Sequence, residues 1–339
     1  MDFTSLIVAV IAFAVTALSG YIVIPYLRKL KFGQTILEIG PNWHKEKQGT
    51  PTMGGVMFIA GVLISIAFGF AYAAIFEKPF FFDCKDKFRL TALIAGLALA
   101  LCMGAIGFFD DYIKVVKKRN LGLTARQKTF MQLLVSALYL TVLAISGMRT
   151  TYIPFIGDVS IVSGFGLIFW PIALMFIYGF TNAVNLTDGI DGLASSVTLV
   201  VSCGFMMAAG FLNLANINVL TAALAGALVG FICWNAHPAK VFMGDTGSMF
   251  LGGMVVAFSF GIGRPVLLLL AGIVYLIEAL SDIIQVAYYK KTKKRIFKMA
   301  PIHHHFEKCG WSEDKIVLVF SFVALIGSVL AVLPIIFSL

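Results

Sequence analysis

The chain has 339 residues, of which 60% are hydrophobic and only 13% are charged, and its mean hydropathy is +0.94. Soluble domains carry roughly 25% charged residues, so this composition excludes a soluble globular protein and indicates an all-α polytopic integral membrane protein. The formal net charge of +9 reflects orientation and attraction to anionic lipid headgroups, and we expect no nucleic-acid partner.

Ten apolar stretches approach the ~20 residues that a helix needs to cross a bilayer. They lie at 4–26, 53–76, 90–109, 129–147, 166–184, 193–212, 218–234, 248–263, 265–289 and 316–338. Ten spans leave little sequence for a soluble domain, so we expect residues 1–339 to form a single transmembrane domain. Two of the stretches, 218–234 and 248–263, are short and glycine-rich, and either one as a re-entrant element would reverse the topology after it. Both are kept as spans.

The basic residues orient these spans. Most of the 26 lysines and arginines fall in alternate loops, at 27–52, 110–128, 185–192, 235–247 and 290–315. The positive-inside rule places such loops in the cytoplasm. We therefore expect both termini outside and these five loops inside.

The first polar motif, Gly49 to Gly55, precedes the second span. Its Thr-Pro-Thr segment is ordinary helix-capping chemistry, whereas its paired glycines allow close backbone packing, so structural and functional interpretations are equally open. Lys47 is suited to contact an anionic ligand, although a lysine beside a span is often a topology anchor.

Adjacent aspartates, Asp110 and Asp111, end the third span. They repel one another unless a cation lies beside them. Mg²⁺ prefers oxygen ligands and is typically held by one or two carboxylates together with substrate phosphates. With Asp245, they predict a site for a metal–pyrophosphate complex. The alternative is a solvated helix end followed by Lys114.

Two glycine-bearing turns follow. In the run Asn185 to Gly192, Asp188 and Asp191 are three residues apart and share a helix face, and the glycines let backbone N–H groups approach a ligand. This suits a ribose, a base edge or a phosphate. The run Gly244 to Ser248 precedes the eighth span and can present Asp245 and helix-terminal amides to phosphate. Plain Asp-Gly turns are the alternative.

The ninth span and the loop after it add further polar groups. Glu278 and Asp282 lie within the span, where an acid is a functional candidate by default, but the sequence names no partner for either. The histidines 303–305 point about 100° apart on a regular helix. They therefore predict loop donors to phosphate or a structural cluster, not a zinc site.

All four motifs, at 49–55, 110–111, 185–192 and 244–248, fall on the cytoplasmic side, although lysines and arginines fixed the topology. Carboxylates and glycines at helix ends are costly in hydrocarbon and contribute little packing. Together they indicate a catalytic or binding surface at the membrane edge.

Read together, these motifs closely resemble the MraY family of phospho-N-acetylmuramoyl-pentapeptide transferases, within the polyprenyl-phosphate N-acetylhexosamine-1-phosphate transferase superfamily. The segments that carry the resemblance are 44–55, 108–112, 123–128, 185–192, 235–239, 242–248 and 301–307. The Asp-Asp pair and the 185–192 run look superfamily-wide. The runs 49–55 and 303–307 look specific to this branch.

The resemblance implies transfer of phospho-MurNAc-pentapeptide from UDP-MurNAc-pentapeptide to undecaprenyl phosphate, giving lipid I and UMP, with Mg²⁺ required. It places the reaction at the bacterial cytoplasmic membrane. It also implies ten transmembrane helices, with the active site on the cytoplasmic face, and a homodimer.

By motif match, the resemblance implies that Asp245 is the principal Mg²⁺ ligand and that Asp110 and Asp111 activate or position phosphate; with His303 they form the expected catalytic set. The residues expected to line the uridine-diphosphate pocket are Lys47, Asn185, Asp191, Asn235 and Phe242, with Phe242 stacking on uracil. The polar positions expected to hold phosphates or the amino-sugar are Lys128, Gln285, His303, His304 and His305.

Two routes stay open: direct attack by the lipid phosphate, with Asp110 cast as base or as positioning group, or a covalent aspartyl intermediate. Direct attack is preferred on chemical grounds. The alternatives in function are a sister transferase that moves GlcNAc-1-phosphate, an ion-coupled transporter, which Glu278 alone favours, and a lipid-binding scaffold.

Overall fold

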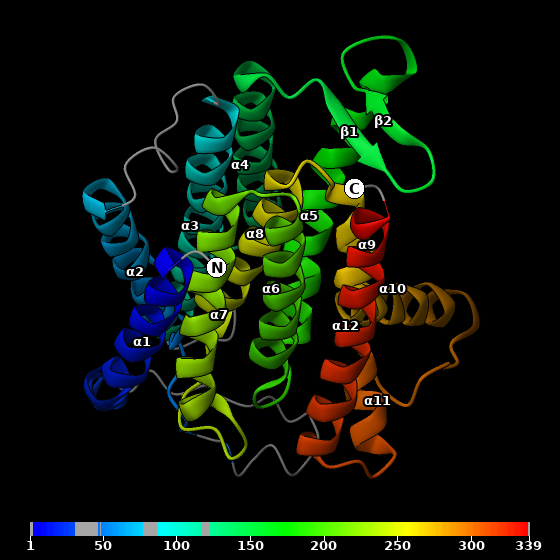
Figure 1. Cartoon of the computed structure of the whole chain (residues 1–339). Helices are drawn as coiled ribbons and strands as arrows, with labels where there is room; N and C mark the ends of the chain where they lie inside the picture. Colours follow the sequence, from blue (N-terminus) through cyan, green and yellow to red (C-terminus); the bar gives the residue numbers. More distant parts are fainter. Residues whose placement is uncertain (1–2, 31–46, 48, 77–86, 117–121, 338–339) are drawn as a thin grey trace.

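The computed structural model describes residues 3–30, 47, 49–76, 87–116 and 122–337, and these form a bundle of long helices (Figure 1). The first four helices are α1 (Phe3–Lys29), α2 (Gly55–Phe76), α3 (Lys87–Val116) and α4 (Ala125–Ser146). A hairpin of β1 (Thr150–Ile153) and β2 (Gly157–Ser160) and the 3₁₀ helix η2 (Gly164–Ile168) follow. Next come α5 (Phe169–Thr187), α6 (Leu193–Phe211), α7 (Ala215–Asn235) and α8 (Gly244–Gly261). The last elements are η3 (Pro265–Leu267), α9 (Leu268–Ala271), α10 (Ile273–Thr292), α11 (Ile302–Lys308) and α12 (Glu313–Ile336).

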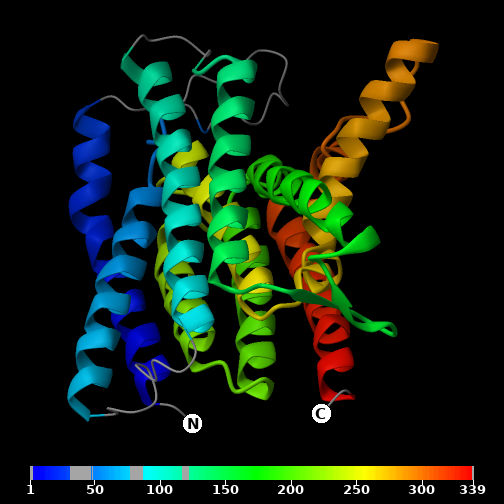
Figure 2. The same ribbon diagram turned by 90° about the horizontal axis from the view of Figure 1, so that it is seen from above.

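The predicted all-α polytopic fold is confirmed. Within the described ranges, eight helices are long and apolar enough to cross a membrane, or nine if the bent segment 265–292 counts as one span. The remaining predicted span, 248–263, corresponds to α8. Figure 2 shows the start of α1 and the end of α12 at the same end of the bundle, as an even number of crossings requires. Ten crossings and their orientation stay predictions.

Helix α8 lies in the interior of the bundle. Every residue from Thr246 to Gly261 is buried, and the helix packs most extensively against α3 and then α5. Gly107 on α3 permits this approach, because a Cβ there would clash with the backbone carbonyl of Asp245. The end of α3 is thereby held against the first turn of α8.

The predicted ninth span, 265–289, differs from a single helix. It breaks at Gly272, and the helices on either side are bent by 79°. Pro265 and Gly272 are both poor residues for a helix interior, which accounts for the short pieces before α10. Helix α10 projects from the bundle (Figure 1), and several of its apolar side chains, including Ile283 at 62% exposure, are left uncovered.

The hairpin is a second difference, because the ten-span pattern predicts no strand. β1 and β2 pair antiparallel, with Thr150 opposite Ser160 and Ile153 opposite Gly157. Phe155 in the connecting turn has a left-handed φ of 68°. The hairpin lies at the end of the bundle opposite α11 (Figure 1).

The run from Gly49 to Gly55 passes beside the segment before α8. The Phe242 amide donates to the Pro51 carbonyl at 2.8 Å, and the Gly54 amide donates to the Phe242 carbonyl at 2.8 Å. These bonds support the structural interpretation of the run. They also fix the chain that enters α2 and leads back to Lys47.

Candidate active site

Three predicted aspartates meet where α3 ends and α8 begins. Asp110, Asp111 and Asp245 each place a carboxylate oxygen within 4.8 Å of the others. Asp110 and Asp111 are 4% exposed, whereas the Asp245 side chain keeps 20% exposure. These three residues are called the acidic cluster.

Uncharged donors hold one oxygen of each carboxylate in the acidic cluster. The pairs are Leu123 N with Asp110 Oδ1 at 2.8 Å, Thr246 N and Oγ1 with Asp111 Oδ2 at 2.9 and 2.8 Å, and Asn185 Nδ2 with Asp245 Oδ1 at 2.9 Å. Asn185 also donates to Ser248 Oγ at 2.8 Å. One carboxylate oxygen of each aspartate is therefore held by these donors. The second oxygen of each carboxylate faces lysine side chains.

The second oxygens converge on two lysines. Lys114 Nζ lies 2.6 Å from Asp110 Oδ2, 3.1 Å from Asp245 Oδ2 and 4.0 Å from Asp111 Oδ1. Lys128 Nζ lies 3.0 Å from Asp245 Oδ2. Three carboxylates thus face two ammonium groups. The ammonium of Lys114 lies between the second oxygens of the three aspartates.

The pKa values of the Asp245 and Asp188 carboxyls shift in opposite directions. Burial opposes ionisation of Asp245, but the charges of Lys128 and Lys114 together with hydrogen bonds from Asp110 and Asn185 lower the pKa of its carboxyl below the ordinary range. Burial raises the pKa of Asp188 well above its ordinary value, and the negative charges of Asp245 and Asp111 raise it further. Asp245 is thus a stable anion beside a carboxyl that resists ionisation.

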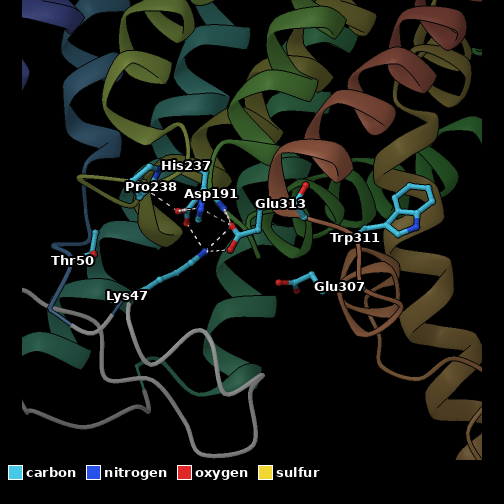
Figure 3. A pocket seen from close by; sticks show the side chains of 11 residues that line it. Lys47, Thr50, Asp191, His237, Pro238, Glu307, Trp311 and Glu313 are labelled. Carbon is cyan, nitrogen blue, oxygen red and sulfur yellow. Dashed lines mark hydrogen bonds and ion pairs between the residues drawn. The ribbon is translucent and has the colours of Figure 1, made fainter.

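A second cluster surrounds Lys47 and lines a cavity of about 700 Å³. Figure 3 shows Lys47 reaching between Asp191, after α5, and Glu313, at the start of α12. Lys47 Nζ lies 2.7 Å from Asp191 Oδ1 and 2.6 Å from Glu313 Oε1. His237 Nδ1 lies 3.1 Å from Asp191 Oδ2. Lys47, Asp191, His237 and Glu313 are called the Lys47 cluster.

The carboxylates of the Lys47 cluster are saturated by protein groups. Asp191 Oδ2 also accepts from the Ala239 amide at 2.9 Å, and Glu313 Oε2 accepts from the Asp191 amide at 2.9 Å. Ligand atoms of Asp191, His237 and Glu313 lie within 4.8 Å of one another. A metal ion there would have to displace Lys47, as one in the acidic cluster would have to displace Lys114.

Three other predicted binding residues have structural partners. Buried Asn235 accepts from Ser195 Oγ at 2.8 Å and donates to the Val241 carbonyl at 3.0 Å. Gln285 accepts from the backbone amides of residues 296 and 297 and donates to the carbonyl of 297, at 2.9 to 3.1 Å. Phe242 is half-buried and bonded through its backbone to the 49–55 run. Asn235 and Gln285 therefore each hold a loop in place, at residue 241 and at residues 296–297.

The three histidines on α11 point to different partners. His303 is buried and lies 3.0 Å from Glu278, from Nδ1 to Oε2. His304 Nδ1 bonds Glu307 Oε2, and His305 Nδ1 accepts from the Lys298 amide at 3.1 Å. The three side chains thus bond different groups, and His303 is the partner of Glu278 that the sequence does not name.

Sequence reasoning missed three contributors. The sequence pattern presented Lys114 only as part of a solvated helix end. His237 was included only as a member of the 235–239 segment, with no role of its own. Glu313 follows Ser312, whose hydroxyl caps α12 by accepting from the Lys315 amide at 3.3 Å. From the sequence alone, Glu313 is therefore explained as an acidic residue that stabilises the positive end of the helix dipole. Only the tertiary fold brings it to Lys47.

Comparisons with known proteins identify the family of this chain. The model of glycosyl transferase family 4 matches residues 93–262, and signature 1 of the phospho-N-acetylmuramoyl-pentapeptide-transferases matches residues 47–59. The curated phospho-N-acetylmuramoyl-pentapeptide-transferase of Listeria monocytogenes serotype 4b (strain CLIP80459) is 44% identical, over 96% of this chain and 97% of its own length. The chain belongs to the phospho-N-acetylmuramoyl-pentapeptide-transferase family.

Other relatives of the same name have similar coverage. The protein of Carboxydothermus hydrogenoformans is 45% identical over 93% of this chain and 94% of its own length. That of Clostridioides difficile (strain 630) is 44% identical over 94% of both chains. The predicted resemblance to the phospho-N-acetylmuramoyl-pentapeptide-transferase family is confirmed. The two matched regions contain the acidic cluster, Lys47, Asp191 and His237.

Proposed function

We propose that this multi-pass membrane protein transfers phospho-N-acetylmuramoyl-pentapeptide from UDP-MurNAc-pentapeptide to undecaprenyl phosphate in the bacterial cytoplasmic membrane, giving lipid I and UMP. The observation that carries the chemistry is the acidic cluster, in which carboxylate oxygens of Asp110, Asp111 and Asp245 lie within 4.8 Å of one another. Family membership supports the substrate class. The homodimer stays a prediction.

The acidic cluster fits Mg²⁺. Its free atoms are carboxylate oxygens, which Mg²⁺ prefers, and an ammonium already stands among them, so the cluster accepts a cation. Asp245, Asp110 and Asp111 would hold the ion. When bound, Mg²⁺ would neutralise pyrophosphate charge and stabilise the departing UMP.

The transfer itself needs little proton chemistry. A phosphate monoester has a second pKa near ~6, so at pH 7 about nine-tenths of the lipid phosphate is already the dianion. Its oxygen attacks the β-phosphorus of the nucleotide substrate while the bond from that phosphorus to the bridging oxygen breaks and UMP leaves. An aspartate with an ordinary pKa of ~3.9 is a poor base for the residual proton, so Asp110 serves to position the lipid phosphate or the metal.

Lysines and the Lys47 cluster supply binding. Lys128 and Lys114 lie beside Asp245 and are placed to neutralise charge on the transferring phosphoryl group. The cavity lined by Lys47 and Asp191 is suited to the nucleotide part of the substrate. The transporter alternative loses its main support, because Glu278 is paired with His303.

The test is UMP release by the purified protein in detergent, comparing UDP-MurNAc-pentapeptide with UDP-GlcNAc, with and without undecaprenyl phosphate, and with Mg²⁺ or a chelator. Release only with the muramyl substrate, lipid and Mg²⁺ is expected. Release without lipid would support the covalent route, and a preference for UDP-GlcNAc would support the sister transferase. No release from folded protein would reject the proposal.

A further inference from the structure

A buried acid–histidine pair joins α10 to α11. Glu278 and His303 have side-chain exposures of 0% and 1%, and Glu278 Oε2 lies 3.0 Å from His303 Nδ1. Glu278 Oε1 and His303 Nε2 have no hydrogen-bond partner among the described residues. The two side chains thus depend on one another for polar contact, inside a helix bundle where polar groups are costly.

The imidazole also touches the turn after α5. Gly189 faces the ring so closely that a Cβ at this position would clash with His303 Nε2. Gly189 separates Asp188, which lies near the acidic cluster, from the segment that carries Asp191 of the Lys47 cluster. His303 therefore lies between Glu278 and a turn that leads from Asp188, near the acidic cluster, to Asp191 of the Lys47 cluster.

Stability alone does not explain the pair. Replacing a buried ionisable pair with apolar side chains of similar volume is often neutral or stabilising. His303 also presents no exposed nitrogen to a substrate, because Nδ1 is bonded and Nε2 is buried. This geometry favours a positional role for His303 over the catalytic role that the family resemblance implied.

We propose that Glu278 is a positioning residue, which acts through His303 to fix the turn at residues 188–191 against the nucleotide-binding cavity. The hydrogen bond to Nδ1 sets the rotation of the imidazole, and the ring edge then sets the position of Gly189. Because Asp191 lies two residues further on and lines the cavity, the pair controls affinity for the nucleotide substrate. The inference rests on the proposed function and deepens it.

The variants are chosen to separate contact from chemistry. Asn in place of His303 puts an amide N–H near the position of Nδ1 and keeps the bond to Glu278, whereas Leu removes it. Glu278→Gln keeps volume and hydrogen bonding, and Glu278→Leu removes them. Asp282→Asn is the matched control, since Asp282 lies one turn along α10 and is only partly buried.

Two readouts are needed on the full-length protein in detergent. The first is kcat and KM for each substrate in the UMP-release assay. The second is hydrogen exchange of residues 185–192, which reports the turn without requiring turnover. Wild-type protein that releases no UMP would reject the proposed function, while the exchange data would still test the positioning contact.

We expect Glu278→Leu and His303→Leu each to raise KM for the nucleotide substrate about 10- to 100-fold, the usual cost of losing an outer supporting partner, with KM for undecaprenyl phosphate unchanged. Their double variant should be no worse than either one, and both should speed exchange at 185–192. Glu278→Gln and Asp282→Asn should stay close to wild type, whereas His303→Asn, which keeps the bond to Glu278 but lacks the ring edge against Gly189, should be impaired like His303→Leu. A His303→Asn variant close to wild type would overturn the proposal, as would unchanged exchange in Glu278→Leu.

Discussion

The acidic cluster and the Lys47 cluster are built from the same materials and differ in the kind of ligand atom that they bring together. Both surround a lysine with buried carboxylates at helix ends. In the Lys47 cluster two carboxylates meet the imidazole of His237. In the acidic cluster all three groups that converge are carboxylates. Because Mg²⁺ prefers oxygen ligands, the kind of ligand atom, more than the presence of acids, distinguishes a magnesium site from an ion-pair network.

Asp245→Asn is the most damaging way to probe this distinction. Loss of the Asp245 negative charge should lower kcat for UMP release about 1,000-fold, corresponding to several kcal/mol of transition-state stabilisation. It should also abolish Mg²⁺ binding measured by calorimetry. Glu313→Gln is the matched control and should leave Mg²⁺ affinity unchanged. Equal loss of Mg²⁺ binding in both variants would show that the two clusters are not functionally distinct.

Asp110→Asn sharpens the role of the acidic cluster further. If Asp110 positions the lipid phosphate or the metal, kcat should fall about 100-fold by the same factor at pH 7 and pH 9, because the lipid phosphate is already ionised at both. The measurement is a pH–rate profile of the variant beside wild type. Strong recovery of the variant at pH 9 would instead favour base catalysis by Asp110.

Glu313→Gln tests the Lys47 cluster. Removing the negative charge frees Lys47 Nζ from a contact of 2.6 Å and weakens a charge-assisted hydrogen bond worth about 1.5 to 3 kcal/mol. KM for the nucleotide substrate should rise about 10-fold, with kcat unchanged. Asp314→Asn, on the exposed next position of the same helix turn, should behave as wild type. A fall in kcat at unchanged KM would move Glu313 into the reaction itself.

The smallest effect is expected for Asp188→Asn, measured as thermal unfolding in detergent with a chelator present. The raised pKa of Asp188 means that the folded state holds its proton to higher pH than the unfolded state does. Stability of wild type therefore falls as pH rises above ~4, the ordinary value, toward the raised value. The variant lacks this loss, so its Tm should exceed that of wild type by about 2 °C per kcal/mol at pH 8. At pH 4 the Tm difference should be smaller; a larger gain at pH 4 would contradict the assignment.

Hydropathy predicted most of the fold because a long apolar run has few alternatives to a membrane helix. It did not reveal the break at Gly272, because the surrounding residues are apolar, and it gave no signal for a hairpin of two four-residue strands. Glycine and proline occur at both the break and the hairpin. They indicate that a helix can end there, but they do not predict the direction in which the chain continues.

The acidic cluster was predictable because its members lie at the ends of two spans that the topology brings to one face. Lys128 and Asn185 also contact Asp245, although the resemblance assigned them to phosphate binding and to the uridine-diphosphate pocket. The pairing of Glu278 with His303 was not predictable, because it depends on how far α10 turns after Gly272. Glu313 was missed for a similar reason: its partners lie 122 and 266 residues away in the chain.

The enclosure of α8 also bears on how the chain enters the membrane. The first turn of α8 is polar and contains Asp245 of the acidic cluster, and the helix also contains several glycines. It is not among the helices of the described residues that are apolar enough to qualify as a span. A segment of this kind gains little from partitioning alone into lipid. Its principal neighbours, α3 and α5, precede it in the chain and are synthesised first. We therefore expect α8 to insert against α3 and α5 after they have assembled, so that the acidic cluster is completed when this helix docks.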